Sequence, residues 1–164
     1  MTGERAAVTG RLGDTVAAAL AMTRTLTDQQ VRQLSADEGW PLAIVAYHIG
    51  LGLRRQAGWM ARALTGEAPF AFEWESTHEM NAVIAGEHAA LRKDDAVRGI
   101  EEGWARLRGV IERMDDADWS RDVFIFNGRR RSAEIVLSRI VVPHAAGHLD
   151  SMRRTLVAAV SGAL

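Results

Sequence analysis

The sequence contains no cysteine, which excludes a disulfide framework, a cysteine-ligated metal and a protein thiol nucleophile. It also lacks an excess of either charge, because 20 basic residues stand against 21 acidic ones and leave a formal net charge of -1. Nucleic-acid-binding domains usually carry a clear basic excess, so nucleic acid is not an expected partner. No apolar run approaches the ~20 residues that cross a bilayer, and the first residues lack a signal-peptide core. These absences predict a cytoplasmic domain with no membrane partner.

Proline is scarce as well, with only Pro41, Pro69 and Pro143 among 164 residues. The stretches between the prolines are rich in alanine, leucine and arginine, which favour helices. Apolar residues recur there every third or fourth position, as they do on the buried face of a helix. We predict helices over residues 3–26, 40–64, 77–92, 94–114 and 132–160, the third and fourth either separate or joined in one bent helix. The chain is therefore expected to form a single domain over residues 1–164, an all-α four-helix bundle.

The two longer connections, residues 66–76 and 115–131, are expected to be loops. Val123–Phe126 is the best strand candidate and precedes the turn pair Asn127–Gly128, but no partner strand is evident. We therefore assign this segment to the second loop. Arg129–Arg131 follow it; they either receive the carboxylates of a ligand or lie in solvent.

A pair of histidines on the last predicted helix is the strongest chemical signal. His144 and His148 are four residues apart, so their side chains point the same way and lie ~6 Å apart along the helix axis. That separation lets two imidazoles share one metal ion, and a catalytic site usually takes a third protein ligand. His48 lies beside the apolar stripe of the second helix and is the candidate. The alternative is that these are core histidines bonded to carbonyls or acidic side chains.

Two segments resemble a known family. Trp40–Pro41 opens the second predicted helix, and His48 follows within two turns; on the last helix Glu134–Leu137 precede the pair His144–Ala145–Ala146–Gly147–His148. In this order and spacing the sequence resembles the DinB/YfiT-like superfamily of helical metalloproteins.

The resemblance implies a four-helix bundle with an unusual connection order, often assembled as a homodimer. It also implies a divalent metal, commonly zinc or nickel, held by three histidines, which correspond here to His48, His144 and His148. Relatives in the superfamily include thiol-dependent transferases and a mycothiol-dependent maleylpyruvate isomerase.

A metal held by three histidines lowers the pKa of a bound thiol or water. Because the chain has no cysteine, the sulfur would come from a small thiol such as mycothiol or bacillithiol. We expect an S-transferase that joins this thiol to a small-molecule electrophile; the sequence assigns no general acid or base. One alternative is a metal-dependent hydrolase that uses metal-bound water. The other is a non-enzymatic ligand-binding or stress protein in which the histidines are structural.

Other polar residues are expected to lie outside the site. Tyr47 either donates to a substrate or packs at the edge of the bundle, and His78 and His88 are expected at the surface. Each metal-bound imidazole normally donates its other N–H to a carboxylate or carbonyl. Asp150 and Glu134 lie on the last helix, but neither has a matching spacing.

Pro143 stands one residue before His144. Proline has no backbone N–H, so the carbonyl of Arg139 is expected to lose its helical partner. The last helix is then either kinked in a way that orients His144 or simply curved.

Overall fold

The computed structural model describes residues 3–67, 69–88 and 90–161 of the chain. The long helices are α1 (Gly3–Thr25), α2 (Leu42–Leu64), α3 (Trp74–Glu87), α4 (Lys93–Arg113) and α7 (Val142–Ser161). Shorter elements are the 3-10 turn η1 (Gln30–Arg32), α5 (Asp116–Ser120), α6 (Ala133–Val136) and the π-helical turn η2 (Leu137–Val141). Three strands complete the fold: β1 (Phe70–Phe72), β2 (Asp122–Phe126) and β3 (Arg129–Ser132).

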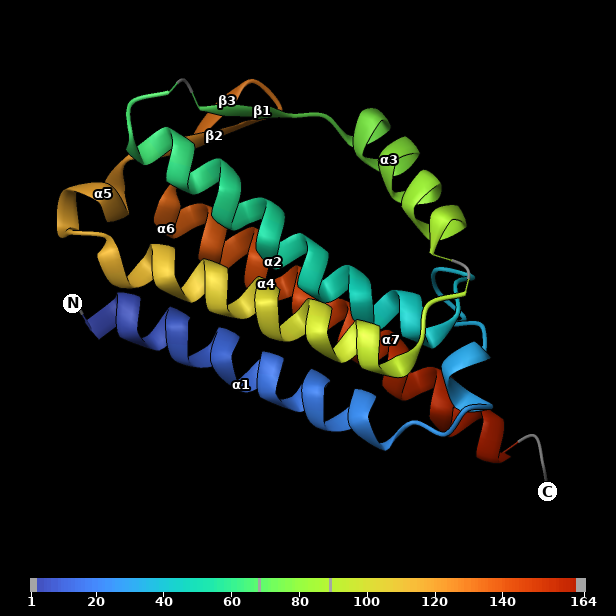
Figure 1. Cartoon of the computed structure of the whole chain (residues 1–164). Helices are drawn as coiled ribbons and strands as arrows, with labels where there is room; N and C mark the ends of the chain where they lie inside the picture. The colour runs from blue at the N-terminus through green and yellow to red at the C-terminus, as the bar shows by residue number, and fades with distance from the viewer. Residues whose placement is uncertain (1–2, 68, 89, 162–164) are drawn as a thin grey trace.

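The bundle consists of α1, α2, α4 and the continuous run of α6, η2 and α7 (Figure 1). Both α1 and α2 pack against α4 and α7, so α1 and α2 lie diagonally opposite each other although they follow one another in the chain. The chain crosses the bundle diagonally a second time between α4 and α7. The predicted helical bundle is therefore confirmed, and its connections follow the unusual order that the resemblance implies.

The contact between α2 and α4 is backbone to backbone. A Cβ atom on Gly50 would lie 2.2 Å from the carbonyl oxygen of Gly99, and one on Gly103 would lie 2.2 Å from the carbonyl oxygen of Gly50. Any side chain at Gly50 or Gly103 would push the two helices apart. The three glycines thus set how closely α2 approaches α4, and with it the position of every side chain on the opposite face of α2.

The expectation that residues 66–76 and 115–131 are loops is wrong. β2 pairs in parallel with β1 and antiparallel with β3, giving a three-stranded sheet in the order β1-β2-β3. Asn127 and Gly128 both have positive φ, as the tight hairpin between β2 and β3 requires. The partner strand β1 comes from a distant part of the chain, and the sheet is held on α2 by Trp59, which stacks on Phe70 with ring centroids 4.1 Å apart.

The last helix also departs from a regular α-helix. Immediately before Pro143, the amide of Val142 donates to the carbonyl of Leu137, five residues back. Proline has no backbone N–H to donate, and the π turn allows for this missing hydrogen bond by inserting one residue into the helix. The insertion also rotates the face of the helix on which the following residues lie. The irregularity expected at Pro143, left open between a kink and simple curvature, is a π turn at Leu137–Val141, and His144 follows it closely.

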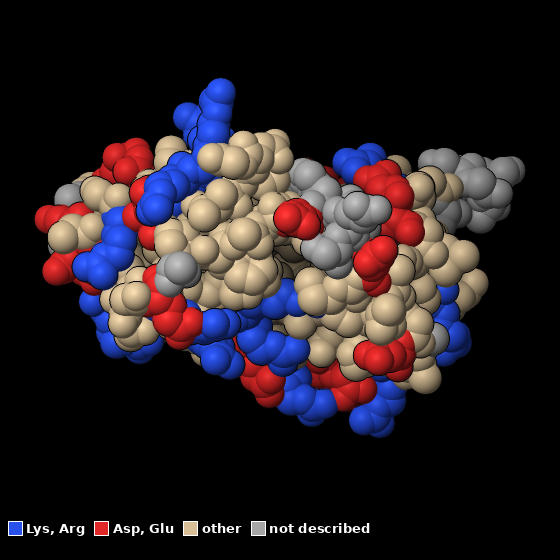
Figure 2. Space-filling model, turned by 90° about the horizontal axis from the view of Figure 1, so that it is seen from above, with Lys and Arg blue, Asp and Glu red and all other residues tan. Residues whose placement is uncertain are grey.

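Figure 2 shows the face of the molecule that carries the sheet and α3. Acidic and basic side chains are mixed on this face, and the surface is hollowed near its centre. Among the described helices, none is both long enough and apolar enough to cross a membrane.

The glycine contact leads to a paired prediction about stability. Gly50→Ala is expected to lower the free energy of unfolding by about 2–3 kcal/mol, because the added methyl group overlaps the backbone of α4. Gly10→Ala places the same methyl group where nothing lies within 4 Å and should raise stability by about 0.5–1 kcal/mol, as helix propensity dictates. Urea unfolding of both variants checks the pair. If the two substitutions change the free energy of unfolding equally, the close approach of α2 and α4 is contradicted.

Candidate metal centre

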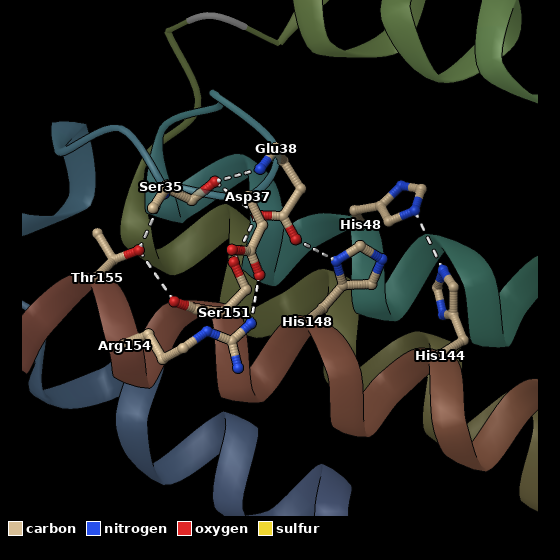
Figure 3. Close-up of polar contacts among 10 residues, drawn as sticks. Ser35, Asp37, Glu38, His48, His144, His148, Ser151, Arg154 and Thr155 are labelled. Atoms are coloured by element: carbon tan, nitrogen blue, oxygen red, sulfur yellow. Dashed lines mark hydrogen bonds and ion pairs between the residues drawn. The ribbon is translucent and has the colours of Figure 1, made fainter.

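The structure brings together the three histidines that the sequence singled out. His48 projects from the middle of α2, and His144 and His148 project from successive turns of α7 (Figure 3). One ring nitrogen from each lies within 4.8 Å of the others. The Nε2 atoms of His48 and His144 are 3.2 Å apart. The histidines therefore converge on one point between α2 and α7.

Gly52 makes room for this convergence. It lies one turn after His48 on α2, and the imidazole of His144 rests against it. A Cβ atom on Gly52 would lie 2.7 Å from Cε1 of His144. The bare backbone at Gly52 therefore allows the imidazole of His144 to approach α2 closely enough to meet His48.

Burial keeps His48 and His144 uncharged. It lowers the pKa of His48 from 6.5 to about 2, helped by the charges that His144, His148 and Arg55 would carry. Burial, followed by the charges of His148 and Arg55, lowers the pKa of His144 from 6.5 to about 3. Both rings are neutral at pH 7, and a neutral imidazole keeps a nitrogen lone pair that can bind a metal.

Glu38 orients the third histidine. Its Oε1 atom lies 2.7 Å from Nδ1 of His148; in the tautomer that donates from Nδ1 to this carboxylate, the lone pair of Nε2 is available. Burial alone would raise the pKa of Glu38, but the hydrogen bonds from Ser151, Ser35 and His148 more than offset it and hold the pKa below its usual value. A carboxylate that accepts the second N–H of a histidine is the usual partner of a metal-bound imidazole.

Residues 35–40 are docked on α7, and this docking places the carboxylate of Glu38. The hydroxyls of Ser35 and Ser151 each donate to Oε2 of Glu38 at 2.6 Å. The amide of Ala36 donates to the hydroxyl of Thr155, and Asp37 pairs with Arg154 (Figure 3). Both oxygens of Glu38 thus have partners, and the carboxylate has a fixed direction.

The spacing of His48 and His144 fits a divalent ion. Two nitrogens bound at ~2.0–2.1 Å to a tetrahedral zinc are about 3.3 Å apart, close to the 3.2 Å between the Nε2 atoms of His48 and His144. On the other side of His48, the ring of Trp40 packs edge-on, with centroids 5.4 Å apart. Three protein ligands leave a tetrahedral ion one position for a substrate or water.

Sequence reasoning did not find Glu38, and its other candidates lie elsewhere. Asp150 is exposed and pairs with Arg153, and neither it nor Glu134 supplies the carboxylate next to His148. The sequence shows only that Glu38 is acidic, that it lies shortly before Trp40, and that it belongs to a short predicted loop. None of these features shows that this loop folds back on α7.

The remaining candidates fall outside the triad. Arg129–Arg131 lie on β3, beside the C-terminal end of α2 (Figure 1), and the structure does not bring them to the histidines. His88 is half-buried and packs edge-on against Tyr47 at 4.8 Å, contrary to the expected surface position. His78 lies on α3, and its side chain is outside the part of the chain that the structure describes.

Replacing the carboxylate at Glu38 is expected to weaken metal binding. Glu38→Gln keeps the size of the side chain but removes the charge that accepts the proton of His148, so zinc affinity should fall about 10- to 100-fold. Competition with a chromophoric chelator measures this change. Glu67→Gln is the matched control, because Glu67 pairs with the exposed Arg62 near the end of α2 and does not touch a histidine. An unchanged affinity in Glu38→Gln would show that Glu38 does not support the site.

A methyl group at Gly52 should disturb the site without unfolding the helix. Gly52→Ala displaces the imidazole of His144 from His48, so zinc affinity is expected to fall by about tenfold or more. Gly58→Ala is the control on the same helix, since nothing lies within 4 Å of its added methyl group. The same chelator competition is used for both variants, and the account fails if they bind zinc equally well.

Comparison with known proteins agrees with this geometry. The model of the DinB superfamily matches residues 11–152, which include all three histidines and Glu38. Neither a curated protein nor a solved structure is similar enough to this chain to give a match. The family match covers most of the chain, and the bundle and the histidine triad are compatible with metal binding in that family. The chain belongs to the DinB superfamily.

Proposed function

We propose that this protein binds one divalent ion through His48, His144 and His148 and acts as a thiol-dependent S-transferase. The observation that supports this most strongly is the meeting of three imidazoles, two of them neutral through burial and the third oriented by Glu38. When bound, an ion such as zinc or nickel supplies a Lewis acid that lowers the pKa of a neighbouring thiol or water.

The sulfur is expected to come from outside the chain, because the sequence has no cysteine. A small thiol such as mycothiol or bacillithiol would provide it. In the net reaction, a bond forms between the sulfur and an electrophilic carbon while the bond from that carbon to its leaving group breaks. The thiol proton passes to the buffer. A homodimeric state and a cytoplasmic location, both expected from the sequence, belong to the same proposal.

The residues around the triad would support this reaction by fixing the ligands. Glu38 keeps the proton of His148 on Nδ1, so that Nε2 faces the shared point. Trp40 covers one edge of His48 and excludes water from that side. Gly52 keeps His144 in reach of His48.

The proposal is tested with monochlorobimane, whose thiol adduct fluoresces when sulfur displaces chloride. Untagged protein loaded with zinc or nickel is mixed with the reagent and with mycothiol, bacillithiol or cysteine in turn. We expect at least one thiol to react faster than its uncatalysed rate. His48→Ala should lose at least about 100-fold of this acceleration, since it removes a ligand. His88→Ala is the matched control, because this histidine packs against Tyr47 and not against the triad.

Three results would contradict the proposal. Acceleration that survives in His48→Ala would show that the triad is not involved. Metal-dependent hydrolysis of 4-nitrophenyl acetate without any thiol-dependent activity would favour the hydrolase, in which water takes the place of the thiol. A protein that binds neither metal would favour structural histidines.

A further inference from the structure

Two adjacent arginines in the middle of α2 have no acidic partner among the residues that the structure describes. Arg54 donates to the hydroxyl of Tyr47 at 3.4 Å, and Arg55 donates from Nη1 to Oδ1 of Asn81 at 3.0 Å. Both arginines are half-buried, and no described carboxylate forms an ion pair with either. By contrast, the exposed Arg62 near the end of the same helix pairs with Glu67 at 2.6 Å.

This arrangement is unfavourable without an anion. Burial and the neighbouring charge of Arg54 both lower the pKa of Arg55, yet a guanidinium stays protonated in proteins. Two like charges therefore lie on neighbouring residues in a partly desolvated place, and their partners in the described part of the chain are neutral oxygens. Buried or half-buried charges are normally paired, so an anionic ligand would relieve this repulsion.

Arg55 lies on the same face of α2 as the histidine triad. It follows His48 by seven residues, which is two helical turns, and Gly52 lies between them. Side chains on a helix generally lean toward its N-terminus, which from Arg55 is the direction of Gly52 and His48. The imidazole of His144 rests on the same Gly52. The charge of Arg55 acts on both His48 and His144, which places it in electrostatic range of the triad.

Figure 2 shows a hollow near the centre of the face that carries the sheet and α3, and basic side chains border it. Asn81, the partner of Arg55, lies on α3. A small molecule entering beside α3 would therefore meet Arg55 on its way to the triad.

We propose that Arg55 is an anion-recognition residue of the triad site, and that the small molecule used there carries a carboxylate a few bonds from its reacting atom. This rests on the proposed function, because it assumes that reactants meet at the triad. A carboxylate suits the site because the planar guanidinium offers it two parallel N–H groups while Nη1 still reaches Asn81. Arg54 is directed to Tyr47, which leaves Arg55 as the arginine of this pair on the face of α2 that carries His48.

The test uses two thiols that differ only in charge. Protein loaded with cobalt(II), as a spectroscopic substitute, is titrated with 3-mercaptopropionate and with 3-mercaptopropionamide, and the thiolate-to-cobalt absorption gives both dissociation constants. We expect the ratio of these constants to favour the carboxylate by about tenfold more in the wild type than in Arg55→Gln. Comparing ratios between variants cancels the difference in acidity of the two thiols.

Arg54→Gln is the matched control, since it removes the same charge from the neighbouring position. It should keep most of the preference for the carboxylate. If Arg54→Gln and Arg55→Gln lose the preference for the carboxylate equally, the preference is a general electrostatic effect and the proposal is overturned. The proposal is also overturned if the ratio of the two dissociation constants is the same in the wild type and in Arg55→Gln. In that case the binding of thiols at the metal would still stand.

A second readout does not depend on thiol binding. Propionate, but not propionamide, should shift the Nε–H resonance of Arg55 in the ¹⁵N spectrum of the zinc-loaded protein. If it does so while no thiol gives a cobalt band, carboxylate recognition stands and thiol activation fails. If propionate competes with 3-mercaptopropionate, the carboxylate belongs to the thiol; if it binds beside 3-mercaptopropionamide, the carboxylate belongs to the electrophile. A resonance unmoved by propionate would overturn the proposal.

Discussion

The site depends on the burial of three imidazoles at one point between α2 and α7. Burial lowers the pKa of His48 and His144 to about 2 and about 3, so neither ring carries a positive charge at pH 7 that would repel a cation. The same burial makes the site costly in the absence of a partner, because neutral ring nitrogens then face each other with few donors. The hydrogen bond between Glu38 and His148 fixes the direction of the third lone pair. A divalent ion would satisfy all three nitrogens at once.

Helix α2 links this site to the rest of the fold. One face carries Gly50, which meets the backbone of α4, and this contact sets the depth at which α2 lies in the bundle. Another face carries His48, Gly52 and Arg55 in consecutive turns. On this face the absence of a side chain at Gly52 has a chemical role, since it admits His144. Small residues on α2 therefore determine both how the bundle packs and where the ligands meet.

The sequence predicted those features that depend on local periodicity. The helices, the shared direction of His144 and His148, and the inward position of His48 all follow from apolar residues repeating every third or fourth position. The sheet could not be predicted, because the partner of Val123–Phe126 is β1, more than fifty residues earlier, and parallel pairing leaves no local pattern. Glu38 was missed for a similar reason. Its role depends on Ser151 and His148, which lie on a helix over 100 residues later.

Metal content of the untagged protein tests the central claim most directly. Wild type and His48→Ala are equilibrated with zinc or nickel, freed of excess metal, and analysed by inductively coupled plasma mass spectrometry, with His88→Ala as the control. The account predicts about one ion per chain in the wild type and in His88→Ala, and a large loss in His48→Ala. A wild type that retains neither metal, or a His48→Ala variant that retains as much as the wild type, would contradict it.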